Sequence, residues 1–161
     1  MRVTAAVILL LGSGCAHRQP SPRALQVPRF ESLVPRGMPL PAGQYRLSRG
    51  FIAPSNQDKG HKGIDLTAER GTPVLATAPG RVILSQFADG GYGEVILIEH
   101  AEGYETLYAH LGERLVREGD RVRRKQPIGR VGATGNATGP HLHYEVRRWG
   151  TPIDPLPFLS E

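Results

Sequence analysis

Short apolar stretches recur between Tyr45 and Phe158, and turn residues rich in glycine separate them. This pattern is typical of many short strands, because no long stretch repeats apolar residues at helical spacing. The sequence therefore favours a single all-β domain. We expect strands at 45–51, 63–67, 73–77, 80–87, 94–100, 104–110, 121–123, 128–132 and 141–147. The dipeptide Glu102-Gly103 between two of these stretches predicts a tight hairpin.

The first residues have the features of a bacterial export signal. Arg2 precedes an apolar run over residues 3–11 that is too short to span a bilayer, and small residues then precede Cys15. A cysteine at this place resembles the lipidation site of bacterial lipoproteins. We therefore expect residues 1–14 to be a lipoprotein signal peptide and Cys15 to carry the lipid anchor. An ordinary secretory signal is the alternative.

Ala16 follows this cysteine. By the same resemblance, it implies export to the periplasmic face of the outer membrane. Residues 15–44 are rich in proline and arginine, a composition that favours an extended tether over a packed core. We expect the folded domain at 45–158 and a short tail at 159–161.

The chain carries a formal charge of +5 and has a pI of about 9.8, which favours anionic surroundings. The densest basic stretch, residues 117–131, lacks the interleaved aromatic side chains that stack on nucleotide bases. An exported protein also meets little nucleic acid. We therefore expect no nucleic-acid partner, and we read the basic stretch as a solvated face that an anionic wall or lipid surface attracts.

Two stretches place histidines on one strand face, because alternate residues of a strand point the same way. In GPHLHYEV, His141 and His143 share a face, and the apolar residues between and after them face away. In YETLYAHL, the alternation puts His110 on the same face as Tyr108. Tyr92, Tyr104 and Tyr108 are candidates for lining a groove, and of these only Tyr108 shares a strand face with a proposed catalytic residue. A packing role for Tyr108 in the wall of the groove is the alternative.

The stretch GHKGIDL adds an imidazole and a carboxylate. His61 and Asp65 share one face of the expected strand, with Gly63 between them leaving room. His100 ends another strand, and a structural role is expected for it.

This set of four histidines and an aspartate suits zinc, which takes neutral imidazole and carboxylate ligands. Catalytic zinc sites use three protein ligands and keep one position open. Two histidines and the aspartate would supply these ligands, and the other two histidines would do acid–base work. The set is typical of metal-assisted amide hydrolysis, although the sequence lacks the HExxH helix motif.

The motifs HKGIDL, YAHL and GPHLHYEV together resemble those of the lysostaphin/LytM-like zinc endopeptidases, peptidase family M23. The resemblance covers 45–158 and implies a mostly antiparallel β domain with a long substrate groove. It implies Zn²⁺ ligands at His61, Asp65 and His143. It also implies catalytic roles for His110 and His141.

The resemblance further implies a peptidoglycan endopeptidase that acts on cross-linked stem peptides. A lipoprotein of the outer membrane would meet D-alanyl–diaminopimelate links, so we expect a DD-endopeptidase. The alternative is a non-enzymatic lipoprotein that activates another wall hydrolase, since the family includes such members. A carrier domain like those that hold biotin or lipoate is disfavoured, because no lysine stands in the usual hairpin attachment motif. The sequence leaves open both a protein regulator and the oligomeric state.

Overall fold

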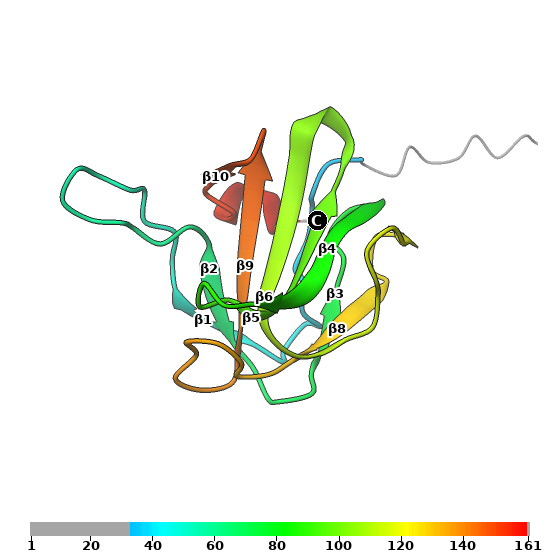
Figure 1. Ribbon diagram of the computed structural model, residues 1–161, viewed down its shortest axis with the longest axis horizontal. Coiled ribbons are helices and arrows are strands. Elements are labelled where there is room, and N and C mark those ends of the chain that lie inside the picture. Colours follow the sequence, from blue (N-terminus) through cyan, green and yellow to red (C-terminus); the bar gives the residue numbers. More distant parts are fainter. Residues whose placement is uncertain (1–32, 161) are drawn as a thin grey trace, which may run out of the picture.

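The structure is a computed structural model that describes residues 33–160. The expected signal peptide at 1–14, the lipidation site Cys15 and the first part of the tether lie outside the described residues. Ten strands and two short 3-10 turns make up the regular structure of the described part (Figure 1). The strands are β1 (Arg46–Arg49), β2 (Ile64–Thr67), β3 (Pro73–Leu75), β4 (Gly80–Ala88), β5 (Gly93–Glu99), β6 (Tyr104–Arg114), β7 (Arg121–Val122), β8 (Pro127–Val131), β9 (His141–Arg148) and β10 (Thr151–Ile153). The 3-10 turns are η1 (Ala101–Gly103) and η2 (Leu156–Phe158).

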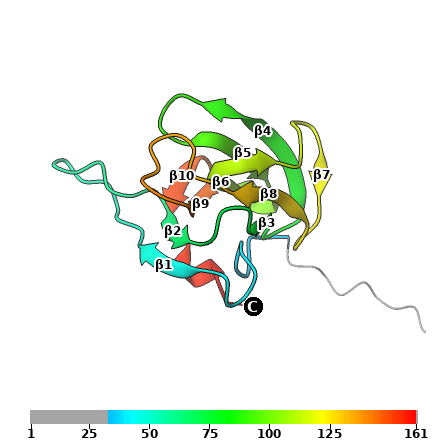
Figure 2. The same cartoon turned by 90° about the horizontal axis from the view of Figure 1, so that it is seen from below.

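The strands form one sheet in the order β1-β2-β9-β6-β5-β4-β7, with antiparallel pairing throughout. β10 pairs with β9, and the long strand β6 also pairs with β8, which in turn pairs with β3. Figure 2 shows the sheet curling, with β8 beside β6 and β3 beside β8. The all-β, mostly antiparallel fold expected from the sequence is confirmed.

The hairpin between β5 and β6 turns at the dipeptide that predicted it. Glu102 and Gly103 have φ values of +58° and +72°, the left-handed conformation that a tight hairpin requires. The strand β10, in contrast, was not expected. It follows β9 closely and contains Pro152, which argues against a strand from sequence alone.

One face of the sheet covers the main hydrophobic core. From β2 and β9, the fully buried side chains of Ile64, Leu66, Leu142 and Tyr144 pack there. The alternating residues of these two strands point to the opposite face, as expected from the sequence. A smaller cluster on that face is built around Val95, Leu107 and Ala109.

Residues 36–40, which we expected to belong to the tether, pack on the domain. Leu40 is only 2% exposed and lies in the main core. The N–H of Leu75 donates to the carbonyl of Pro39, at 2.8 Å, and the N–H of Arg36 donates to that of Thr77, at 3.0 Å. Prolines near Leu40 keep the segment extended but leave their carbonyls able to accept such bonds. The packed part of the chain therefore begins before Tyr45.

In residues 33–160, no helix has the length and apolar character needed to cross a bilayer.

Candidate metal centre and catalytic histidines

The three motifs meet because β9 lies between β2 and β6 in the sheet (Figure 1). Asp65 of β2 and Ala109 of β6 both stand opposite His143 of β9. Opposite residues of neighbouring strands share a face, so Asp65 and His143 project to the same side. His61 lies just before β2, where a two-residue bridge with Ile52 holds it.

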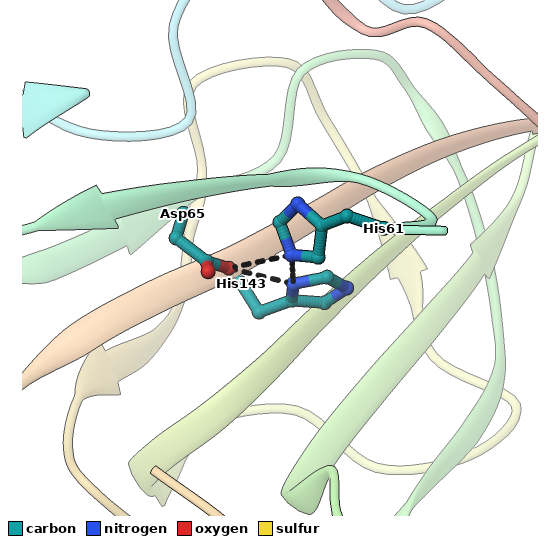
Figure 3. Close-up of side chains that lie close together, drawn as sticks. All are labelled: His61, Asp65 and His143. Carbon is teal, nitrogen blue, oxygen red and sulfur yellow. Dashed lines mark hydrogen bonds and ion pairs between the residues drawn. The ribbon is translucent and has the colours of Figure 1, made fainter. Parts of the chain in front are cut away.

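Three donor atoms converge at this place (Figure 3). Oδ1 of Asp65 lies 2.8 Å from Nδ1 of His143 and 3.2 Å from Nε2 of His61. The two histidine nitrogens lie 3.2 Å from each other. One ligand atom from each residue falls within 4.8 Å of the others, which is a compact three-ligand set.

The far nitrogen of each of these histidines is already bonded. Nδ1 of His61 donates to the carbonyl of Gly50 at 2.7 Å, and Nε2 of His143 lies 3.0 Å from a carboxylate oxygen of Glu145. Because these nitrogens carry the protons, the near nitrogens present lone pairs to each other and to Asp65. In these neutral tautomers three acceptor atoms converge, and a cation placed among them would be held by all three. Two imidazoles and a carboxylate with fixed tautomers fit Zn²⁺.

The electrostatics of the site agree with a cation-binding role. Burial raises the pKa of Asp65, but the hydrogen bond that a protonated His143 donates to it and the charges of the nearby histidines hold that pKa below the ordinary value. Burial lowers the pKa of His143, but its bonds to Asp65 and Glu145 raise it overall. Asp65 is therefore a carboxylate at neutral pH, and His143 attracts positive charge.

Two further histidines lie beside the three proposed metal-ligand atoms. The rings of His110 and His141 have centroids 4.6 Å apart, and His110 lies 5.9 Å from the ring of His143. Nδ1 of His110 donates to the carbonyl of Thr134, and Nδ1 of His141 donates to that of Gly139, each at 2.9 Å. Nε2 is therefore the basic nitrogen of both rings. Burial and the neighbouring histidines keep the pKa of His110 below its ordinary value, so this ring is neutral at neutral pH.

A bulge in β6 brings His110 to this face. Tyr108 stands opposite Ile96 and Leu111 opposite Glu94, so β6 has one residue more than β5 in this interval. The extra residue of the bulge is accommodated at His110, whose φ is +59°. Regular alternation would have placed His110 on the core side.

The expectation that Tyr108 lines the groove is wrong, because the bulge separates its face from that of His110. Tyr108 is fully buried in the main core beside Tyr144. Its hydroxyl accepts a bond from the N–H of Thr77 at 3.1 Å.

His100 has the structural role expected for it, since its Nδ1 donates to the carbonyl of Pro79 at 2.9 Å and its Nε2 lies 2.7 Å from the Thr106 hydroxyl.

Sequence reasoning missed the group behind His143. Glu145 is fully buried, accepts a hydrogen bond from the Tyr92 hydroxyl at 2.6 Å and binds Nε of Arg147 at 2.7 Å. Burial raises the pKa of Glu145, but the bonds from His143, Tyr92 and Arg147 lower it overall, so it is ionised. The alternation that singled out His141 and His143 continues to Glu145 and could have found it.

The three proposed metal ligands and the two further histidines line a cavity of about 320 Å³. Its other lining residues are Arg49, Gly90, Gly91, Tyr92, Asn136 and Thr138. A larger hollow of about 810 Å³ lies elsewhere, beside β4, β5 and β7, and none of these five residues lines it.

A sequence model of peptidase family M23 matches residues 59–155. Over 96 residues the chain is 53% identical to the DD-carboxypeptidase/endopeptidase Mpg of Neisseria meningitidis, which covers 60% of this chain and 22% of Mpg. It is 40% identical over 133 residues to the uncharacterized lipoprotein YgeR of Escherichia coli, covering 80% of this chain and 53% of YgeR. It is also 40% identical over 102 residues to the murein hydrolase activator NlpD of E. coli, covering 63% of this chain and 27% of NlpD.

Among solved structures, a zinc-containing peptidase from Vibrio cholerae superimposes with a TM-score of 0.69 and 34% sequence identity. The match covers 75% of this chain and 39% of the peptidase. The chain therefore corresponds to about a fifth of the length of Mpg and to less than half of that peptidase.

Proposed function

The chain belongs to peptidase family M23, and on this premise we propose that it is a zinc-dependent endopeptidase that hydrolyses peptide cross-links of peptidoglycan. The observation that carries the proposal is the convergence of three metal-ligand atoms beside two further histidines with basic nitrogens. The family alone does not decide this, because a relative such as NlpD is named an activator.

In this proposal His61, Asp65 and His143 hold the zinc ion. A bound zinc ion makes a water molecule more acidic and polarises the scissile carbonyl. The protein fixes the geometry in advance, since Gly50 and Glu145 hold the far nitrogens of the two histidine ligands. Such fixed ligands limit the reorganisation that metal binding and catalysis require.

His110 and His141 handle the protons. His110 is neutral at neutral pH, so its Nε2 can accept the proton of the attacking water. His141 stands next to it and can orient the water, and the proton that His110 accepts passes to the departing amine, directly from His110 or through His141. The carbon–nitrogen bond then breaks, one water is consumed, and a carboxylate and an amine are released.

The bond that fits best is the one between D-alanine and diaminopimelate. Residues 1–14 are expected to be a lipoprotein signal peptide that precedes Cys15, and a relative of 40% identity is named a lipoprotein. A lipid-anchored protein on the periplasmic face of the outer membrane would meet these direct cross-links. The 53% identity to a protein named a DD-carboxypeptidase/endopeptidase supports the same bond.

The second candidate function is activation of another wall hydrolase without catalysis, which the 40% identity to NlpD favours. An activator of this kind needs a surface for its partner but no metal and no proton acceptor. In this chain all five positions of the site are present and assembled. We therefore place the enzyme first.

The test is a digest of isolated peptidoglycan sacculi by the full-length, zinc-loaded protein, with released fragments identified by mass spectrometry. We expect new D-alanine carboxyl ends and free diaminopimelate amines, which a chelator abolishes. The matched control is His110→Ala, which should bind zinc and release nothing. No fragments from folded, zinc-loaded protein would reject the enzyme, and stimulation of a separate amidase by His110→Ala would establish the activator.

A further inference from the structure

Arg49 is the one arginine or lysine that lines the cavity of the candidate site. Its side chain is exposed, and none of the ion pairs within residues 33–160 involves its guanidinium. The carboxylate nearest to it in the sheet register, Asp65, is engaged by histidines instead. The cavity therefore contains an unpaired positive charge next to a cation-binding site.

The backbone around Arg49 is tied to two of the three proposed metal ligands, Asp65 on β2 and His61 just before it. Arg49 stands opposite Asp65 in the β1–β2 pairing. The next residue, Gly50, accepts the bond from Nδ1 of His61. The preceding residue, Ser48, donates its hydroxyl to the backbone carbonyl of Asp65 at 3.1 Å. The backbone at Arg49 is therefore fixed relative to the site.

A cation beside a metal site repels the metal, so an unpaired arginine there favours an anionic ligand. Of the anions a peptidase meets, a carboxylate suits arginine best, because the planar guanidinium donates two parallel hydrogen bonds to its two oxygens. With zinc bound, the cavity would carry positive charge on both sides of a substrate. Such a site selects peptides with a negative group close to the scissile bond.

The proposed substrate has such a group, and the inference rests on the proposed function in this respect. In a D-alanyl–diaminopimelate link, the carbon that bears the scissile nitrogen also bears a free carboxylate. The same is true of the terminal D-alanine in a stem peptide that is not cross-linked. In both, the carboxyl carbon is two bonds from the nitrogen that leaves.

We propose that Arg49 binds this carboxylate and makes the site specific for peptides whose residue after the scissile bond ends in a free carboxylate. Cross-links and uncross-linked stems ending in two D-alanines are then substrates of one site. Bonds in the middle of an ordinary peptide lack the group and are poor substrates. Arg49 is thus a specificity-determining residue that contacts the substrate but does not move a proton.

The test compares a stem pentapeptide ending in two D-alanines with the same peptide amidated at its end. We expect the zinc-loaded protein to prefer the free acid by about 10- to 100-fold in kcat/KM, the range of a charge-assisted hydrogen bond. Arg49→Gln should remove the preference by raising KM for the acid while kcat changes little, and Arg49→Lys should restore part of it. The matched control is Arg46→Gln, an exposed arginine of the same strand that does not line the cavity.

A binding measurement separates this inference from the proposed catalysis. Calorimetry with zinc-loaded His110→Ala should show tighter binding of the acid than of the amide, and the difference should vanish when Arg49→Gln is added. If no peptide is hydrolysed but this binding difference is present, the carboxylate site stands and the endopeptidase fails. If acid and amide are hydrolysed equally, or Arg49→Gln behaves like Arg46→Gln, the inference is overturned while the endopeptidase stands. If neither hydrolysis nor binding occurs, both are overturned.

Discussion

Nε2 of His143 lies 3.0 Å from Oε1 of Glu145, two residues further along the same strand. The bond fixes which nitrogen of His143 carries the proton and so which one can bind a metal. The Tyr92 hydroxyl and the Arg147 guanidinium hold the carboxylate from its other sides. One buried glutamate thus links the proposed zinc ligand to the interior of the domain.

Glu145→Gln is expected to weaken zinc binding by about 10- to 100-fold, because a neutral amide supports the His143 imidazole less well than a carboxylate. Competition with a coloured chelator at pH 7 measures the affinity. The control is Tyr92→Phe, which removes one hydrogen bond to the carboxylate but keeps its charge, and which should have a smaller effect. Unchanged affinity in a folded Glu145→Gln variant would show that Glu145 does not support the ligand.

Zinc should raise the melting temperature of the wild-type protein, since a ligand that binds only the folded state stabilises it. At a thousand times the dissociation constant the gain is about 4 kcal/mol. Asp65→Ala removes one of the three ligand atoms, so its melting temperature should respond little to zinc. Thermal unfolding followed by circular dichroism, with zinc and with a chelator, measures both. An equal response of the two proteins would place the metal elsewhere.

His110→Gly is expected to be more stable than His110→Ala, although both should lose hydrolysis. The φ of +59° at this position is strained for a residue with a Cβ atom and unstrained for glycine. We expect a difference of about 1 kcal/mol in the free energy of unfolding, which urea denaturation can measure. If alanine were the more stable, the bulge would not have the left-handed conformation described here.

Stability is expected to fall between pH 7 and pH 5 through His100. Burial lowers the pKa of this histidine to about 4, although the bond to the Pro79 carbonyl opposes the shift. The unfolded chain has the ordinary pKa of about 6.5 and so takes up the proton first. The stabilisation is therefore complete above about pH 6.5 and is lost as the pH falls toward 4, by about 2 kcal/mol at pH 5.

His100→Gln isolates this effect, because the other titrating groups remain. Urea midpoints at pH 7 and pH 5 should differ less in the variant than in the wild type. Equal losses in the two proteins would assign the pH dependence to groups other than His100.

Gly63→Ala should disrupt the site without touching a ligand. A Cβ atom at this position would lie 2.2 Å from the carbonyl oxygen of Tyr144, so β2 and β9 could not stay at their present spacing. We expect a loss of several kcal/mol in stability, in the range of severe overpacking, together with weaker zinc binding. Gly50→Ala is the control, since a Cβ there meets no atom within 4 Å.

The alternation of side chains predicted most of this fold and much of the candidate site. His141 and His143 do share a face, with Leu142 and Tyr144 buried on the other. The room at Gly63 was also foreseen, but the main chain of β9 fills it rather than a ligand.

The parts of the fold and site that were not predicted depend on features that the alternation of side chains along a strand does not reveal. The bulge at His110 adds one residue to β6, so every face assignment across it shifts, and Tyr108 moves from the expected groove into the core. The packing of Leu40 depends on partners distant in sequence, since its neighbour Pro39 bonds to Leu75. Tyr92 gains its role only through Glu145, which is 53 residues away along the chain, and no local pattern specifies such a contact.

The position of β9 between β2 and β6 has a consequence for how the molecule folds. Asp65 and His143 are separated by 78 residues along the chain, so their strands must meet through a long loop closure. Pairings of this kind form slowly, and no short fragment of the chain can assemble the three ligands. Zinc capture should therefore be a late event in folding, and the rate at which the chain takes up the ion would report when the last central strand docks.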